Sequence, residues 1–307
     1  MPSLALTLAQ AQRLWNLDTA ATKCRSNRKG RQRCPHVRRA AGWGSRKVKD
    51  IQRRDVRELL DEIAERAPIM ANRTLALVRK VFNFAIEHDW VETNPCHMIK
   101  RPAPERQRER VLSDDKIRRV WKTLDAEHPI IAALFRLRLL TAQRGGELLG
   151  ATWSEMDLAS AWWTIPAERS KNGLAHRVPL SPQALRILKA LRKTTGDSPW
   201  VFPSTRKNGP HISHAQKAIE RIVERSGVEF RGHDLRRTAA SLMVGAGVPR
   251  LVVSKILNHV ETGVTAVYDR HSCDQEKRQA LDFWGRRLEA IIGKKRDAKV
   301  LKFLARA

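Results

Sequence analysis

Apolar side chains recur at every third or fourth position along two stretches between residues 47 and 99. The first stretch contains Val56, Leu59, Leu60 and Ile63, and the second contains Leu75, Val78, Val81, Phe82 and Ala85. Such spacing places apolar side chains on one face of an α-helix. Asp50 or Asp55 is suited to open the first helix, and Asn94-Pro95 ends the pattern. Residues 47–99 are therefore predicted to form a small helical bundle.

The apolar period becomes shorter between residues 151 and 180. Residues on the strand period, most of them apolar, flank the turn sequence Lys171-Asn172-Gly173: Trp162, Trp163 and Ile165 before it, and His176, Val178 and Leu180 after it. Asn-Gly between two such runs is a strong signal for a β-hairpin. We expect a hairpin that carries Lys171 at its tip.

Helical spacing surrounds this hairpin on both sides. Ser113 followed by Asp114 and Asp115 is a helix-capping sequence. The remaining helical patterns cover residues 130–149, 184–191, 215–223, 235–244 and 251–257. Residues 112–290 are thus predicted to form one domain. The fold class of the whole chain is mainly α with a small β-hairpin or sheet.

Three segments lie outside the two predicted domains. Residues 1–46 contain nine Lys or Arg between Lys23 and Arg46 and no acidic residue among them, which indicates a poorly ordered basic arm. Residues 100–111 combine prolines with basic side chains, as a linker does. Residues 291–307 form a basic tail in which Val300, Leu301, Phe303 and Leu304 have helical spacing.

The charge balance narrows the choice of partners. The 307 residues include 59 Lys and Arg against 32 Asp and Glu, a formal net charge of +27. This excess favours a polyanion, with nucleic acid first and an anionic membrane surface second. The chain has no apolar run of about 18 residues that could span a bilayer. Its four cysteines are scattered, which favours a reducing compartment, and Cys24, Cys34 and His36 fit no common zinc module.

A few residues of the second domain could carry chemistry. Arg144 precedes two glycines and Glu147, His233 and Arg236 share a helix face, and the single tyrosine, Tyr268, follows His259. Taken singly, these pairs also fit a surface ion pair and an ordinary polar helix face. Together, arginines, histidines and a lysine suit the charged transition state of phosphoryl transfer, with tyrosine as nucleophile. No clustered acidic pattern accompanies them, so we expect neither a metal nor a cofactor.

The ordered set resembles the active site of the tyrosine recombinases, specifically the prophage-type integrases. It consists of Arg144 with Glu147, Lys171, His233, Arg236, His259 and Tyr268. The resemblance covers roughly residues 48–288. It implies a helical core-binding domain and a catalytic domain that close around duplex DNA as a C-shaped clamp. It also implies a site-specific recombinase that integrates or excises a prophage or mobile element.

The resemblance assigns a role to each residue. Tyr268 attacks the scissile phosphate and leaves a 3′-phosphotyrosine, while Arg144 and Arg236 bind the non-bridging oxygens. Lys171 protonates the leaving 5′-oxygen. His233 assists proton transfer, His259 hydrogen-bonds the phosphate, and Glu147 orients the pocket from the second shell. The implied partners are duplex DNA with attachment core sites, further copies that turn a monomer in solution into a homotetramer on DNA, and accessory DNA-bending proteins. The implied location is the bacterial cytoplasm, at the nucleoid.

The sequence also departs from the family pattern. Ala142 and Asn258 stand where relatives usually have glycine, and residues 1–46 are too short and irregular for a folded arm-binding domain, which is therefore missing or truncated. Two other functions stay open at this point. One is a truncated, non-catalytic DNA-binding relic or regulator, and the less favoured one is a type IB topoisomerase. The tail, residues 291–307, is suited either to dock on a neighbouring protomer or to cover its own domain.

Overall fold

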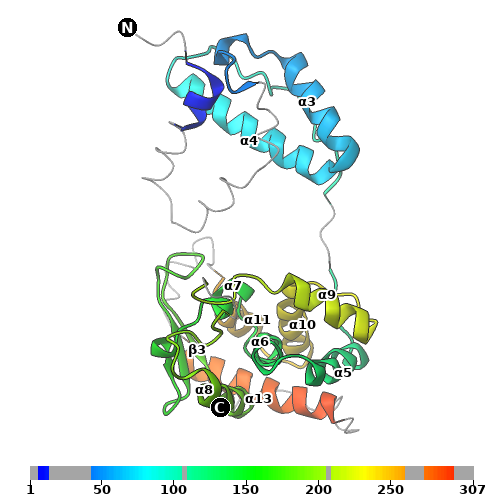
Figure 1. The fold of residues 1–307 in the computed structure, drawn as a ribbon, viewed down its shortest axis with the longest axis vertical. Coiled ribbons are helices and arrows are strands. Elements are labelled where there is room, and N and C mark those ends of the chain that lie inside the picture. The colour runs from blue at the N-terminus through cyan, green and yellow to red at the C-terminus, as the bar shows by residue number, and fades with distance from the viewer. Residues whose placement is uncertain (1–5, 14–42, 106–108, 205–208, 260–272, 294–307) are drawn as a thin grey trace. The chain divides into compact units, whose positions relative to one another are not determined.

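The computed structural model describes residues 6–13, 43–105, 109–204, 209–259 and 273–293 (Figure 1). The chain forms two compact units that divide between Arg108 and Glu109, inside the range 100–111 that the sequence assigns to a linker. Each unit has a hydrophobic core of its own. The C-shaped clamp concerns the placement of the units relative to one another and stays a prediction. None of the described helices is long and apolar enough to cross a bilayer.

The first unit is built on two helices that meet at Ala67. These are α3 (Arg53–Arg66) and α4 (Pro68–Glu87), preceded by the short 3-10 helix η3 (Val48–Asp50). Of the two acidic residues expected to open the first helix, Asp55 lies in its first turn, where its Oδ2 accepts the N–H of Gln52 at 2.7 Å. The apolar faces read from the sequence are buried between the helices.

Part of the segment predicted as a poorly ordered arm is folded into this unit. Residues 8–13 are helical, and Leu8 donates its N–H to Arg46 O at 3.0 Å. Leu8 and Ala11 share one face of this short helix because they are three positions apart, and both are buried in the same core as Val48. The prediction is therefore wrong for residues 6–13 and 43–46, whereas residues 14–42 lie outside the described residues.

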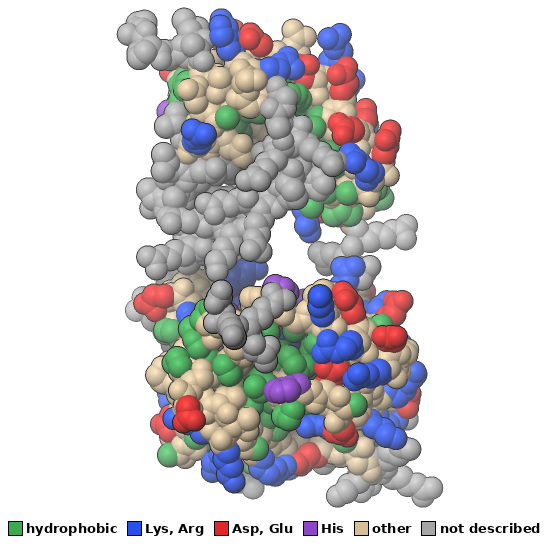
Figure 2. Space-filling model, in the orientation of Figure 1, with side chains coloured by type: hydrophobic (Ala, Val, Ile, Leu, Met, Phe, Trp, Pro, Cys, Tyr) green, Lys and Arg blue, Asp and Glu red, His purple; other side chains and the backbone are tan. Residues whose placement is uncertain are grey.

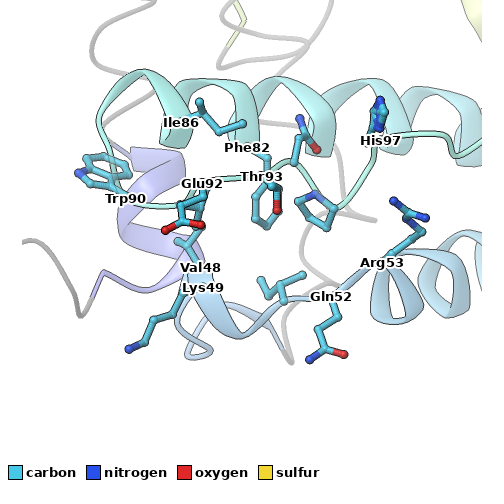
Figure 3. A pocket seen from close by; sticks show the side chains of 14 residues that line it. Val48, Lys49, Gln52, Arg53, Phe82, Ile86, Trp90, Glu92, Thr93 and His97 are labelled. Carbon is cyan, nitrogen blue, oxygen red and sulfur yellow. The ribbon is translucent and has the colours of Figure 1, made fainter.

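A groove of about 880 Å³ is hollowed into the first unit (Figure 3). It lies between the start of α3 and the segment that follows α4, with Phe82 and Trp90 among its apolar lining residues. Lys49, Arg53 and Glu92 also line it, so charges of both signs border it. Of the residues predicted to act in catalysis, those that the structure describes do not line this groove.

The second unit holds the remaining helices and the sheet. In chain order the helices before the sheet are α5 (Asp114–Thr123), η4 (Leu124–Ala126), α6 (Pro129–Thr141), α7 (Gly145–Leu149) and η5 (Trp153–Glu155). The helices after it are α8 (Pro182–Thr195), α9 (Gln216–Ser226), α10 (Gly232–Gly245), α11 (Arg250–Ile256) and α13 (Asp274–Ile292). Ser113 caps α5 as expected, because its Oγ accepts the N–H of Lys116 at 3.4 Å. The rest of the predicted tail, residues 294–307, lies outside the described residues.

A three-stranded antiparallel sheet confirms the small β element. The strands β1 (Met156–Asp157), β2 (Trp162–Ile165) and β3 (His176–Pro179) pair in the order β1-β2-β3. Ile165 pairs with His176, so residues 166–175 form a long connection instead of the tight Asn-Gly turn that the sequence suggests. Burial of Trp163, Ile165 and Val178 fixes this register, since a shift by one residue would expose them.

Helix α6 lies at the centre of this unit and is contacted by α8, α10 and α13. Its side chains Leu134, Phe135 and Leu139 are fully buried. Trp284 of α13 donates its indole N–H to Leu139 O at 2.8 Å, which fixes α13 against α6. The long apolar stretch that the sequence showed at residues 130–149 is therefore a pair of helices, α6 and α7, with Arg144 at their junction.

Candidate active site

The carbonyl groups that end α11 accept hydrogen bonds from both arginines that the sequence singled out. Arg236 donates from Nη2 to Leu257 O, and Arg144 donates from Nη2 to Asn258 O at 3.3 Å. Carbonyls at the C-terminus of a helix have no partner within the helix and carry partial negative charge. The two guanidinium groups therefore meet at one end of α11, although they come from different elements.

Arg144 is fixed by a buried carboxylate. Its Nη1 lies 3.0 Å from Oε1 of Glu147, and its backbone N–H donates to Oε2 of the same residue at 3.1 Å. Glu147 is 4% exposed, whereas the Arg144 side chain is 21% exposed. The ion pair thus holds the inner side of the guanidinium and leaves part of it accessible.

Arg236 is held by carbonyls instead. It is buried on α10, and its Nη1 donates to Ala142 O at 2.8 Å. No described carboxylate forms an ion pair with it, and burial lowers its pKa to about 10, with the charge of Arg144 acting in the same direction. Arg236 remains a cation at neutral pH, so it provides a fixed positive charge ready for an anion.

The two histidines of the predicted set border the arginines. His233 is in the first turn of α10, and His259 follows α11. Burial lowers the pKa of each imidazole below its ordinary value, and the charge of Arg236 lowers both further. His233 and Lys171 are also among the groups whose charges lower the pKa of His259, so these side chains are neighbours. Both histidines are neutral at pH 7 and can accept or donate a proton.

Lys171 lies on the connection between β2 and β3, and its two sequence neighbours are tied to Asn258. Asn172 Nδ2 donates to Asn258 Oδ1 at 2.9 Å, and Asn258 Nδ2 donates to Ser170 Oγ at 2.9 Å. We call Ser170, Asn172 and Asn258 the amide clasp. It holds the segment that carries the exposed Lys171 against the end of α11, one residue before His259.

Ala142 and Asn258, the two departures from glycine, both have left-handed backbone angles. Their φ values are 54° and 48°. Glycine adopts this region without steric cost, whereas a residue with a β-carbon is strained there. In this chain Ala142 presents its carbonyl to Arg236 and Asn258 presents its carbonyl to Arg144. Both of these strained positions thus present a carbonyl to an arginine of the site.

Gln143 and His176 are buried residues of the site that the sequence pattern did not single out as functional. Gln143 Nε2 and His176 Nε2 both donate to Ile256 O, at 2.9 and 3.0 Å. Burial lowers the pKa of His176 to about 4, with the charges of Lys277, Arg236 and Arg144 acting in the same direction. His176 is thus a neutral donor that joins β3 to α11. The period-two pattern gave its place on the strand but no sign of its partner.

The structure brings together Arg144, Glu147, Lys171, His233, Arg236 and His259 from four separate segments of the second unit. Tyr268 lies outside the described residues. Among the residues that the structure describes, no group of three or more His, Cys, Asp or Glu is arranged to hold a metal. The arrangement of cations and neutral imidazoles is suited to bind a phosphate and to move protons around it.

Charge is widely distributed over the second unit. On the face shown in Figure 2, Lys and Arg side chains cover much of the surface near α5 and α9, with Asp and Glu among them. Several of these arginines are paired, such as Arg221 and Arg225 with the buried carboxylate of Glu127. Of the two arginines of the site, Arg144 is paired with Glu147, and no described carboxylate forms an ion pair with Arg236.

Comparisons with known proteins match both units. A family model described as "Phage integrase family" matches residues 110–275, and one described as "Phage integrase central domain" matches residues 20–102. Prophage integrase IntZ of Escherichia coli (strain K12) is 29% identical over 255 residues, which cover 81% of this chain and 63% of that protein. The integrase of Salmonella phage P22 is 29% identical over 184 residues, covering 56% of this chain and 46% of that protein. The chain thus spans less than two thirds of the length of both relatives.

Solved structures show the same fold. The lambda integrase tetramer bound to a Holliday junction has a TM-score of 0.66 at 18% identity, covering 84% of this chain and 79% of that one. The Tn1549 transposon integrase in complex with circular intermediate DNA has a TM-score of 0.65 at 15% identity, covering 89% of this chain and 98% of that one. The mainly helical fold with a small sheet is therefore confirmed.

Proposed function

Because this chain belongs to the phage integrase family, we propose that it is a site-specific DNA recombinase that cleaves and rejoins duplex DNA through a 3′-phosphotyrosine. The observation that carries the proposal is the pair of guanidinium groups, Arg144 and Arg236, fixed at the end of α11 beside two neutral histidines. The named relatives, a prophage integrase and a phage integrase, support integration or excision of a prophage or mobile element as its role.

The two arginines bind the non-bridging oxygens of the scissile phosphate. Each already has part of its guanidinium occupied by carbonyls or by Glu147, which fixes its direction before DNA arrives. A preorganised charge of this kind stabilises the extra negative charge of the transition state at little reorganisation cost. Glu147 orients Arg144 through their ion pair.

Tyr268 supplies the nucleophile. Its oxygen forms a bond to phosphorus as the bond from phosphorus to the 5′-oxygen breaks, and the phenolic proton passes to His233. Lys171 donates a proton to the leaving 5′-oxygen, and His259 donates a hydrogen bond to the phosphate. The number of phosphoester bonds is unchanged, so a different 5′-hydroxyl can reverse the step without ATP.

Duplex DNA with attachment core sites is the proposed substrate, and four copies assemble on it from monomers in solution. The structural relative that is a tetramer on a Holliday junction supports this assembly. Accessory DNA-bending proteins and action at the nucleoid in the bacterial cytoplasm belong to the same proposal. The domain assignment that goes with it is a core-binding domain at 47–99, a linker at 100–111, a catalytic domain at 112–290 and a tail at 291–307.

A nicked suicide duplex tests the proposed reaction. Duplexes taken from the DNA that flanks the gene carry a nick beside the candidate cleavage position, so that the short 5′-fragment diffuses away after cleavage. We expect the wild-type protein to form a covalent adduct that survives denaturing electrophoresis. The Tyr268→Phe variant keeps duplex binding but forms no adduct, because it lacks the attacking oxygen. Binding without an adduct on any nicked duplex would support the non-catalytic DNA-binding protein instead.

A further inference from the structure

Arg138 on α6 is a buried arginine that the proposed reaction does not use. It is 8% exposed, and no described residue forms a hydrogen bond or ion pair with it. Its only described ring contact is with Phe135, whose centroid lies 5.9 Å from Cζ. Nε is buried without a partner, whereas Nη1 and Nη2 are not among the buried atoms and so reach solvent. The exposed part of Arg138 is the tip of its guanidinium.

Two glycines make room for this guanidinium. A β-carbon on Gly145 would lie 2.8 Å from Nη2 of Arg138, and one on Gly232 would lie 2.6 Å from the same atom. Real β-carbons do not approach other atoms this closely. The absence of side chains at Gly145 and Gly232 therefore leaves the space that the guanidinium of Arg138 occupies, which we call the Arg138 slot. Gly145 follows Arg144 and Gly232 precedes His233, which places the slot at the edge of the candidate active site.

In the protein alone, the charge of Arg138 has no counter-charge in this slot among the described residues. Burial lowers the pKa of Arg138 to about 10, so it is a cation at neutral pH, and its charge contributes to lowering the pKa of His233. A buried charge without a counter-charge is costly, and proteins normally pair it. The acidic residue of the adjacent turn, Asp234, is directed elsewhere, to the N–H of Arg231 at 2.9 Å and to Arg237.

The start of α10 adds a second feature that favours an anion. This helix has 14 residues and begins at Gly232, beside the guanidinium tip. The first backbone N–H groups of a helix lack partners within it and form its positive end, where phosphate groups bind readily. The guanidinium tip of Arg138 therefore lies beside the N-terminus of α10.

We propose that Arg138, together with the first N–H groups of α10, binds a backbone phosphate of the DNA strand that enters the active site. The inference rests on the proposed function, because DNA is its source of phosphate. It adds a third arginine to the phosphate-binding groups and gives Gly145 and Gly232 a common purpose. Arg138 acts in binding, and the chemical step stays with the residues named above.

The test compares Arg138→Met with wild type in binding a short fluorescent duplex at a series of salt concentrations. One lost phosphate contact should reduce the slope of log affinity against log salt by about 0.9. The affinity at low salt should fall about tenfold to a hundredfold, since hydrogen bonds to charged groups are among the strong ones. Arg136→Met is the matched control, because Arg136 lies on the same helix and is already paired with Asp125. It should keep the wild-type slope.

Thermal melting separates binding from a structural role. Replacing an unpaired buried charge by an apolar side chain of similar length is often neutral or stabilising. Arg138→Met should therefore melt at or above the wild-type temperature, and Arg138→Lys should recover part of the salt slope. If Arg138→Met melts lower and its folded fraction keeps the wild-type slope and affinity, Arg138 is structural and the inference is overturned.

A scan with neutral phosphates identifies the contact and keeps the two proposals apart. Duplexes with one methylphosphonate at each successive position should show one position at which wild type loses affinity and Arg138→Met does not. Failure to find such a position overturns the role of Arg138 even if wild type forms the covalent adduct. Conversely, a wild-type protein that forms no adduct refutes the recombinase, while the scan still reports on Arg138.

Discussion

Asn258 and Ala142 hold backbone angles that residues with a β-carbon rarely adopt. The left-handed region costs an L-residue on the order of 1 kcal/mol, and glycine avoids this cost. In both cases the strain accompanies a carbonyl that faces an arginine of the site. Asn258 also gains its side-chain bonds to Asn172 and Ser170. Asparagine thus combines a tolerated left-handed backbone with the amide clasp.

Substitutions of Asn258 distinguish the effect of the amide clasp from the effect of the backbone strain. Asn258→Gly and Asn258→Ala both remove the clasp, but only glycine relieves the backbone strain. The glycine variant should be more stable to unfolding than the alanine variant by about 1 kcal/mol. Both should form the covalent adduct more slowly, on the order of tenfold, because the segment that carries Lys171 loses a hydrogen-bonded support. Urea unfolding and single-turnover adduct formation measure the two effects.

Asn172→Ala is the companion variant, because it removes the Asn172 part of the clasp without changing the end of α11 and leaves the bond from Asn258 to Ser170. It should slow adduct formation to a similar extent. Adduct rates equal to wild type in all three variants would show that the clasp does not position Lys171. If the variants form the adduct at the wild-type rate but unfold at lower urea concentrations, the clasp contributes to stability only.

Among the elements, the C-terminus of α11 is the junction of the site. Ile256, Leu257 and Asn258 present successive carbonyls to donors from the α6–α7 junction, from α10 and from the β2–β3 region. His259 follows directly. A displacement of α11 would therefore disturb both arginines and the clasp together. The contribution of His176 to this junction can be tested by its pH dependence.

The stability contributed by His176 should depend on pH below about 6.5. Its pKa is about 4 in the folded protein and near 6.5 in an unfolded chain, so the unfolded state takes up the proton first as the pH falls. The stability is fully present above pH 6.5 and is lost between about 6.5 and 4, in total on the order of 3 kcal/mol. His176→Gln keeps a donor toward Ile256 but does not titrate.

Urea unfolding of wild type and His176→Gln at several pH values measures this contribution. The free energy of unfolding of wild type should fall relative to the variant as the pH is lowered from 7 to 5. Both proteins share their remaining titrating groups, so the difference isolates His176. Parallel curves over this range would contradict a buried, neutral histidine at this junction.

The sequence predicted elements better than connections. Periodicity located the paired strands and most helices because burial of one face determines the period. It mistook the Lys171 segment for a tight turn, since Asn-Gly is a strong hairpin signal by itself. In the structure the side-chain amide of Asn172 donates a hydrogen bond to Asn258, 86 positions away. The last strand pair before the connection is Ile165 with His176. A contact between residues so far apart in the sequence does not change the period of apolar positions, so the period cannot predict it.

For the whole molecule, the net charge of +27 predicted a polyanionic partner but not where it binds. The structure locates incompletely neutralised arginines at the α11 junction and in the Arg138 slot. The resemblance to the tyrosine recombinases predicted that Arg144, Lys171, His233, Arg236 and His259 lie in one site. Gln143, His176 and Arg138 were missed because amide, imidazole and guanidinium groups on buried faces look like ordinary polar positions in a sequence.

The identity of the residue joined to DNA tests the proposed 3′-phosphotyrosine mechanism. The chain contains a single tyrosine, Tyr268. An adduct formed on a nicked duplex is digested with nuclease and protease, and the modified peptide is identified by mass spectrometry. The predicted result is a nucleotide linked through its 3′-phosphate to Tyr268. A linkage through serine or histidine, or through a 5′-phosphate, would contradict the mechanism.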